Sequence, residues 1–89
     1  MAAIGILETR GLTGATNAMD AMCKNAAVSV QQLVRPGGGH ITIVATGDVA
    51  SVQSAIEAGA FAALAIGGEL VCQAVIPNPH PDLVPFLGD

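Results

Sequence analysis

The stretch RPGGGH, Arg35 to His40, places a guanidinium and an imidazole on either side of a proline and three glycines. Glycine-rich loops can bind phosphate through backbone amides that converge on the anion. A P-loop is disfavoured here, because no Gly-Lys-Ser/Thr follows and the loop leads into a strand pattern instead of a helix. Pro-Gly is also a common turn signal. The loop therefore holds a ligand, makes a turn, or acts together with other copies of itself.

The other reactive side chains predict no catalytic site. Copies of His40 around a symmetry axis could hold a metal or an anion, but we favour a histidine that begins a strand and bonds to its neighbours. Cys23 and Cys72 lack metal-motif spacing and are interpreted as small buried hydrophobic residues. The acidic residues form no motif-like acid/base pair, and no base is evident for either cysteine. We expect no catalytic residue, no cofactor and no metal.

Composition predicts one small domain, residues 1–89, that assembles with other chains. Of the 89 residues 52% are hydrophobic and only 11% are charged, whereas soluble domains average about 25% charged. A chain of this size exposes a large share of its surface, and these few charges are too few to cover it. Some of the apolar surface must therefore be buried against other chains, which indicates an obligate oligomer.

Composition also excludes several function classes. The net charge is −4, with only three Lys and Arg residues and no Trp or Tyr, which disfavours nucleic acid as a partner. The longest small or apolar run, residues 58–68, is shorter than the ~20 residues that span a bilayer. Glu8 and the lack of a basic start disfavour a secretory signal at the N-terminus. These features and the two unpaired-looking cysteines favour a reduced, cytosolic protein with no membrane partner.

Hydrophobic spacing in the first half of the chain predicts a strand, a helix and a hairpin. The aliphatic run at residues 3–9 reads as a buried strand. Apolar residues then recur at helical spacing from Gly11 to about Lys24, and Asn25 is a reasonable helix terminator. Residues 28–31 and 41–46 alternate with strand period. The two runs should be antiparallel neighbours joined by the glycine loop.

The second half predicts another helix, another strand and a short tail. Asp48 is expected to cap a helix that ends at Gly67-Gly68. Its apolar stripe comprises Val49, Val52, Ile56, Ala60 and Ala63. Gly59 within that helix costs about 1 kcal/mol relative to Ala, which predicts a close packing partner there. Residues 69–76 form the last strand, and DLVPFLGD could form one helical turn.

The predicted order, β-α-β-β-α-β, is that of the ferredoxin-like α+β fold. An antiparallel sheet would carry both helices on one face, followed by a short C-terminal helical tail. This fold hosts enzymes, sensors and RNA-binding proteins, so it assigns no function alone.

Three segments carry a resemblance to a known family. They are GILETRGLTGATNAMDAMCKNAAV, RPGGGHITIVATGDVASVQSAIEAG and VIPNPHPDL. They resemble the hexamer-forming shell proteins of bacterial microcompartments over nearly the whole chain. The most specific elements are the E-T-R-G-L helix start, the D-A-M-x-K run, the glycine-rich loop before a strand ending in GDV, and the I-P-x-P-H close.

The resemblance implies a structural protein and not an enzyme. In that family, wedge-shaped subunits close into flat homohexamers, which meet edge to edge with other shell proteins and coat encapsulated enzymes in the bacterial cytoplasm. The alternatives are an oligomeric small-molecule-binding regulator on the same fold and a small oligomeric enzyme that uses His40 and a carboxylate.

The resemblance also implies a role for the opening loop. In the family this loop lines a pore on the symmetry axis, through which small polar metabolites pass. In this chain Pro36, Gly37, Gly38, Gly39 and His40 would line it. Glycine removes side-chain bulk where copies of one segment meet. Many relatives carry serine where Gly38 falls, so this pore should lack a ring of hydroxyls.

A second set of residues is implied at the contact between hexamers. Lys24 of the D-A-M-x-K run would pack against its counterpart in the next hexamer; in an isolated sequence it would be interpreted as a solvated lysine at a helix end. Asn78 stands where the family usually has an arginine, which implies weaker edge contacts. His80 belongs to the same edge segment and is interpreted as structural.

Overall fold

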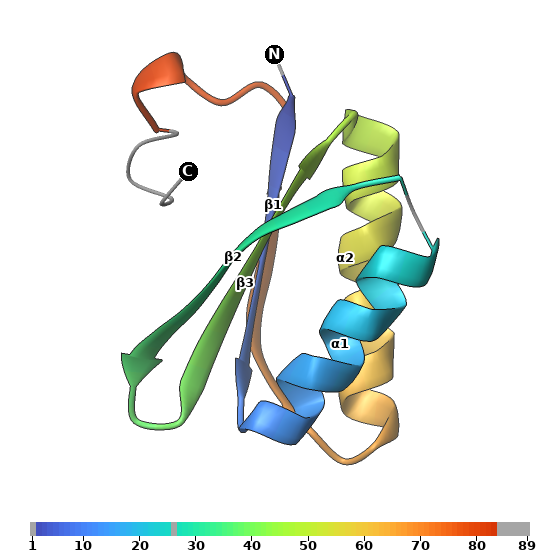
Figure 1. Ribbon diagram of the computed structural model, residues 1–89, viewed down its shortest axis with the longest axis vertical. Helices are drawn as coiled ribbons and strands as arrows, with labels where there is room; N and C mark the ends of the chain where they lie inside the picture. The colour runs from blue at the N-terminus through green and yellow to red at the C-terminus, as the bar shows by residue number, and fades with distance from the viewer. Residues whose placement is uncertain (1, 26, 84–89) are drawn as a thin grey trace.

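The computed structural model describes residues 2–25 and 27–83 as four strands and two helices. The elements are β1 (Ala3–Arg10), α1 (Leu12–Asn25), β2 (Ser29–Gly37), β3 (His40–Gly47), α2 (Val49–Ala65) and β4 (Glu69–Ile76). The strands form one antiparallel sheet in the order β2-β3-β1-β4. Both helices lie on the same face of that sheet (Figure 1). This confirms the predicted ferredoxin-like α+β fold.

The hairpin between β2 and β3 is tighter than the sequence predicted. The expected strand at residues 28–31 is too short, because β2 continues through Arg35 and Pro36 to Gly37. Proline is tolerated there because β2 is an edge strand. Only Gly38 and Gly39 form the turn, with φ of +63° and +80°. Positive φ at both central residues is what a two-residue hairpin of this twist requires, and glycine provides it without strain.

The core lies between the sheet and the two helices. The buried residues are Ala3, Leu7, Ile41, Ile43 and Ala45 from the sheet, Ala15, Ala18 and Met22 from α1, and Val52, Ala55, Ile56, Ala60 and Ala63 from α2. The predicted stripe of α2 is confirmed, except that Val49 is 45% exposed. Alternate residues of β1 and β3 supply this layer, because successive strand residues point to opposite faces.

Two glycines allow the helices to approach their neighbours closely. A Cβ on Gly59 would lie 2.8 Å from Met22 Cγ, so α1 is the packing partner that the mid-helix glycine predicted. A Cβ on Gly5 would lie 2.7 Å from carbon atoms of both Val52 and Ile56. Real Cβ atoms do not pack at such distances, so β1 and α2 touch at Gly5 only because a side chain is absent there.

Both ends of α2 have the caps that the sequence predicted. The amide of Ser51 donates to Asp48 Oδ1 at 3.0 Å. This hydrogen bond is the main reason why the pKa of Asp48 lies below its ordinary value. At the other end Gly67 has a φ of +78°, and the amides of Gly67 and Gly68 donate to carbonyls of the last turn at 3.0 and 2.9 Å. This pattern is a Schellman motif, which satisfies carbonyls that the helix leaves free.

After β4 the chain turns to the side of the sheet that faces away from the helices (Figure 1). Pro79 is buried there, and residues 81–83 form a single turn closed by a hydrogen bond from the amide of Leu83 to the carbonyl of His80, 2.9 Å long. The predicted helical tail is thus described only at its start, since residues 84–89 lie outside the described residues. No helix among the described residues is both long and apolar enough to cross a membrane.

The close approach at Gly5 gives a stability test. Gly5→Ala should lower the free energy of unfolding by about 1 to 3 kcal/mol, because the added methyl group overlaps two buried side chains. Gly14→Ala is the matched control: its Cβ would lie 3.4 Å from Gly68 Cα, an ordinary contact, and helix propensity should add up to about 1 kcal/mol. Chemical denaturation of both variants measures the difference. Equal stability of Gly5→Ala and the parent would contradict the packing described here.

Candidate functional site

The glycine turn projects into open space at one end of the molecule. Gly37, Gly38 and Gly39 are all exposed. A Cβ on Gly37 or Gly38 would meet no atom within 4 Å, while one on Gly39 would lie 3.7 Å from Arg10 Cγ. The tip of the turn is therefore free of contacts with its own chain, and only its base rests on β1. Such a tip is available to solutes and to other molecules.

The register of the sheet brings three polar side chains into one row beside the turn. Arg10, the last residue of β1, lies opposite His40 on β3 and opposite Glu69 on β4. The guanidinium Nη2 donates to His40 Nε2 at 3.1 Å. On the other side, Nε lies 4.0 Å from Glu69 Oε2. We call Arg10, His40 and Glu69 the Arg10 row.

The hydrogen bond between Arg10 and His40 requires an acceptor nitrogen on the imidazole. A guanidinium has five N–H donors and no acceptor. His40 Nε2 must therefore be the acceptor, so the ring is neutral in this arrangement and carries its proton on Nδ1. The bond exists only while His40 is uncharged.

The base of the turn is attached to the junction between β1 and α1. The amide of Gly11 donates to the carbonyl of Gly39 at 2.8 Å, and the stem of Arg10 lies against Gly39. A hollow of about 260 Å³ opens beside this junction. It is lined by Gly11, Leu12, Gly37, Gly39, His40 and Ile41. The turn, the hollow and the Arg10 row thus form one continuous candidate site, the loop end.

The next cross-strand pair on β1 and β4 holds one of the two cysteines. Cys72 Sγ donates to Glu8 Oε1 at 3.3 Å, and this hydrogen bond, followed by burial and by the charge of Glu8, raises the pKa of the Cys72 thiol. The thiol is thus kept protonated and weakly nucleophilic. Cys23 and Cys72 are both exposed, so the prediction of buried cysteines is wrong. Residue type alone did not reveal that Cys72 lies on the sheet face away from the helices. No group of three possible metal ligands occurs among the described residues.

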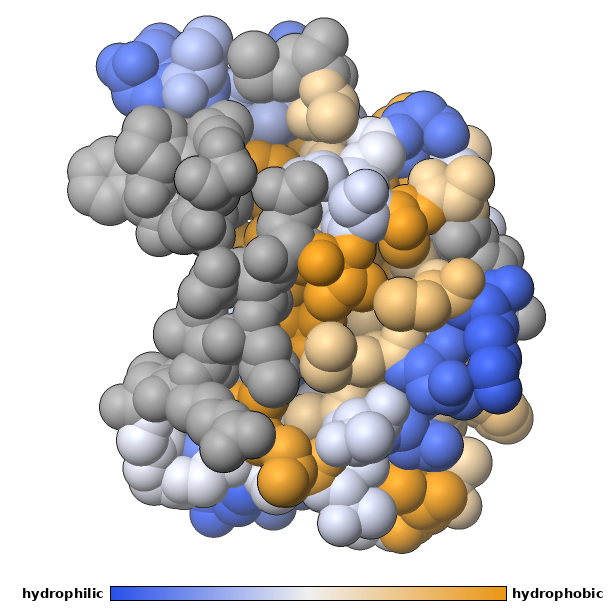
Figure 2. Space-filling model, viewed as in Figure 1, coloured by the Kyte–Doolittle hydropathy of each residue, from blue (hydrophilic) through white to orange (hydrophobic). Residues whose placement is uncertain are grey.

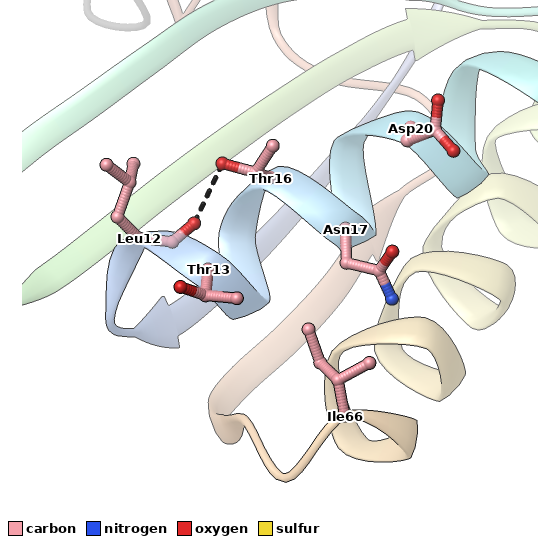
Figure 3. Close-up of a pocket in the computed structure, with 6 residues that line it drawn as sticks. All are labelled: Leu12, Thr13, Thr16, Asn17, Asp20 and Ile66. Carbon is pink, nitrogen blue, oxygen red and sulfur yellow. Dashed lines mark hydrogen bonds between the residues drawn. The ribbon is translucent and has the colours of Figure 1, made fainter.

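A larger groove, of about 530 Å³, runs between α1 and the end of α2 (Figure 3). Its lining residues are Leu12, Thr13, Thr16, Asn17, Asp20 and Ile66. Thr16 Oγ1 donates to the carbonyl of Leu12 at 2.8 Å, and Asn17 Nδ2 donates to the carbonyl of Ala62 at 2.8 Å. Both polar groups are thus used within the chain, and the second bond joins the two helices. The groove offers no set of converging polar groups for a ligand.

Large apolar side chains reach the surface of the described chain. They are Leu12, Val49, Phe61, Leu64, Ile66 and Val71, with Phe61 72% exposed. Figure 2 shows orange apolar surface spread over the face in view and not confined to the interior. The total exposed area of 4780 Å² equals the roughly 4,800 Å² typical of a compact monomer of this mass. The apolar exposure therefore reflects composition and not loose packing.

The predicted edge residues lie far from the turn. α1 begins beside the loop end and leads away from it (Figure 1), and Lys24 in its last turn forms an exposed ion pair with Asp20, 2.9 Å long. Asn78 and His80 follow β4 at the end of the sheet away from the turn and are exposed. His80 Nδ1 accepts from the amide of Asp82 at 3.1 Å. The structure does not join Lys24 to Asn78 or His80 within one chain.

The structure thus groups some of the predicted site residues and adds others. Gly37, Gly38, Gly39 and His40 lie together; the backbone of Pro36 directly precedes them, and its side chain lies outside the description. Arg10 and Glu69 were not predicted as site residues. The predicted strands ended and began one residue short of the pair, because β1 continues to Arg10 and β3 begins at His40. Antiparallel pairing of strands that meet at the same end then brings the two residues together.

Comparisons with known proteins agree with this architecture. The BMC domain family matches residues 3–79. The chain is 47% identical over 94 positions to the bacterial microcompartment shell protein EutM of Salmonella typhimurium, with 100% of this chain and 97% of that protein covered. It is 44% identical to the shell protein PduA of Citrobacter freundii, covering 96% and 90%. It is 40% identical to the carboxysome shell protein CsoS1 of Prochlorococcus marinus, covering 98% and 84%.

A solved structure shows the same fold. The crystal structure of a microcompartment protein from Desulfitobacterium hafniense superposes with a TM-score of 0.85 at 36% identity, over 93% of this chain and 47% of that one. This chain spans about half the length of that solved chain. The family model matches residues 3–79, and the solved structure matches 93% of this chain. The chain therefore belongs to the BMC domain family, and its relatives EutM, PduA and CsoS1 are microcompartment shell proteins.

Proposed function

We propose that this protein is a shell protein of a bacterial microcompartment, in which six copies form a ring with the glycine turn at the axis and Lys24 at the rim. The observation that carries the proposal is the placement of the two sets of residues. The glycine turn and the segment of Asn78 lie at opposite ends of a molecule 35 Å long, and α1 leads from the end with the turn toward Lys24 at the side of the molecule (Figure 1). A wedge with this arrangement presents one set to the centre of a ring and the other to its perimeter.

The chemistry of the turn suits an axial position. Copies of one segment that meet at an axis have little room for side chains, and the tip of this turn has none. Positive φ at Gly37, Gly38 and Gly39 turns successive peptide groups in a way that can present amides to a solute. A pore lined in this way would be narrow and polar, and would suit small polar metabolites.

The surface chemistry suits assembly. Exposed Phe61 and Leu64 on α2 offer apolar area that a neighbouring chain could cover. β2 and β4 are the two edges of the sheet and present unpaired backbone groups. The partners in this proposal are copies of the same chain, other shell proteins of the same compartment and, on the inner side, the encapsulated enzymes.

The role is structural and not catalytic. The relatives are shell proteins. The raised pKa of Cys72 also disfavours a nucleophilic role for that thiol.

The ring is tested by mass in solution. We expect light scattering to give about 53 kDa, six copies of 8.8 kDa, and the same mass over a wide range of dilutions, because burial of the exposed apolar side chains drives association. Electron microscopy should then show sheets or tubes. A stable monomer or dimer would refute the ring. Discrete oligomers that form no sheets would favour the alternative, a small-molecule-binding regulator on the same fold.

Assembly of rings is tested at Lys24. Lys24→Asp should leave the ring mass unchanged and reduce sheet formation, because each contact between rings would then oppose two anions instead of two amphipathic stems. Added salt should restore part of the sheet yield. Sedimentation and electron microscopy measure the yield at each salt concentration.

A matched control separates this effect from the ion pair within the helix. Asp20→Asn removes the 2.9 Å pair but keeps Lys24, and should form sheets like the parent. Asn78→Arg, which introduces the residue usual in the family, should make sheets that resist higher salt. If Lys24→Asp forms sheets as readily as the parent, Lys24 is not at the ring contact.

The pore is tested at Gly38. Gly38→Leu should seal the axis with a ring of apolar side chains and slow the entry of a small polar solute into assembled shells. The native φ is +63°, so the substitution should also cost about 1 to 2 kcal/mol per subunit in stability. Flux and a crystal structure of the ring measure the two effects.

Gly38→Asn is the matched control for backbone strain. Asparagine tolerates positive φ better than leucine does and offers polar groups, so its shells should pass polar solutes faster than Gly38→Leu shells. Unchanged flux through a visibly closed axis, or a Gly38 found at the outer rim, would contradict the pore role.

A further inference from the structure

Among the side chains that the structure describes, the titratable groups beside the glycine turn are those of the Arg10 row. Its members come from three neighbouring strands and are paired by the register of the sheet. The side chains of Arg10 and Glu69 are 55% and 64% exposed, so protons and salt reach them. Neither the shell role nor the pore role requires a histidine to accept a hydrogen bond from an arginine at this place.

We propose that His40 and Arg10 form a proton-sensitive latch that holds the glycine turn when His40 is neutral and releases it when His40 is protonated. Control of the pore by this latch rests on the proposed function, whereas release of the turn on protonation does not. Two observations carry it: the 3.1 Å bond from Arg10 Nη2 to His40 Nε2, and the position of the Arg10 stem beside Gly39, with Cγ 3.7 Å from where a Cβ on Gly39 would lie.

The closed state follows from the neutral imidazole. While Nε2 keeps a lone pair, Arg10 donates to it and lies across the base of the turn. Gly39 then has the Arg10 stem beside it and accepts a hydrogen bond from the amide of Gly11 at 2.8 Å. The turn itself provides no side-chain contacts, because its residues are glycines. The latch therefore adds a side-chain restraint to the backbone pairing of Gly37 with His40 and to the Gly11 bond.

The released state follows from one added proton. A protonated imidazole has no acceptor nitrogen, so the bond to Arg10 is lost and two positive charges face each other at hydrogen-bond distance. Arg10 has an alternative partner, because Glu69 Oε2 lies 4.0 Å from its Nε. Movement of the guanidinium toward Glu69 would relieve the repulsion and withdraw its stem from Gly39.

The described charged groups on the same side of the sheet as His40 lie on β1 and β4. On β1 they are Arg10 and Glu8, whose carboxylate accepts from Cys72. On β4, Glu69 provides the second position for Arg10. No acidic residue stands in the first turn of α1. Histidine changes charge between about pH 8 and pH 5, the range in which the switch would operate.

In a ring each copy would carry its own latch, and all of the latches would respond to the same change of pH. Each protonated His40 would add one positive charge beside the axis and free one glycine turn. Acidification would thus make the pore entrance more mobile and more attractive to anions.

The test is hydrogen exchange of backbone amides, followed by NMR on the assembled protein between about pH 8 and pH 5. Protection factors, which are corrected for intrinsic exchange, should fall for Gly11 and for Gly37 to Gly39 on acidification. We expect a fall of about three- to fivefold, the factor that one exposed charged contact provides. Amides of β1 and α2 should not change. No fall at the turn would overturn the latch.

Three variants identify the group responsible. His40→Gln keeps an acceptor for Arg10 but cannot gain a proton, so protection should stay high at every pH. His40→Lys carries a fixed charge, so protection should be low at every pH. His80→Gln removes the other histidine of the chain and should respond like the parent. A pH response that survives in His40→Gln would overturn the proposal.

The two proposals fail separately. Exchange at the turn is measured whether or not a pore exists, so a ring with its turn away from the axis can still show the latch. Conversely, a pore whose flux depends on Gly38 but whose turn shows no pH response would refute the latch and keep the pore. Flux through shells of His40→Gln and His40→Lys, compared at one pH, then measures whether the latch controls passage.

Discussion

The arrangement of this molecule depends on the register of β1, one of the two inner strands of the sheet, which is paired on both sides. Eight residue pairs fix β1 against β3, from Ala3 opposite Gly47 to Arg10 opposite His40. One face of the strand fills the core and the other carries Glu8 and Arg10. A slip of one residue would exchange these faces and place charged groups against the helices. The same register puts the glycine turn beside Arg10, so the core and the loop end are determined together.

The helical layer is held close to β1 by the absence of side chains. Gly5 and Gly59 allow α2 to approach β1 and α1 at distances where a methyl group would overlap Val52, Ile56 or Met22. More than half of the described core residues are alanines, so the core is thin, as is usual for one chain of this size. The large apolar side chains that remain, such as Phe61, are left outside. A thin core and an apolar surface are thus two results of one composition, and both favour a protein that is completed by its neighbours.

The sequence was sufficient for the order of elements, the caps of α2 and the last strand, because each depends on local patterns. Asp48 and Gly67 act through hydrogen bonds to residues at most a few positions away. The sequence was insufficient for features that depend on how strands pair with one another. β2 continues through Pro36 because the sheet leaves that strand at an edge, and Cys72 is exposed because its position on β4 faces away from the helices. The pairing of Arg10 with His40, 30 positions apart, likewise required the register.

Charge is scarce in this chain, and the two cations whose side chains are described have distinct settings. Lys24 is in the last turn of α1, where a positive charge is favoured by the helix dipole, and it pairs with Asp20 four residues earlier. Arg10 ends β1 and lies between a histidine on β3 and a carboxylate on β4. The first pair is placed by the geometry of a single helix turn. The second set is placed only when three strands pair in the correct register. One cation thus depends on local structure and the other on the long-range pairing that also forms the core.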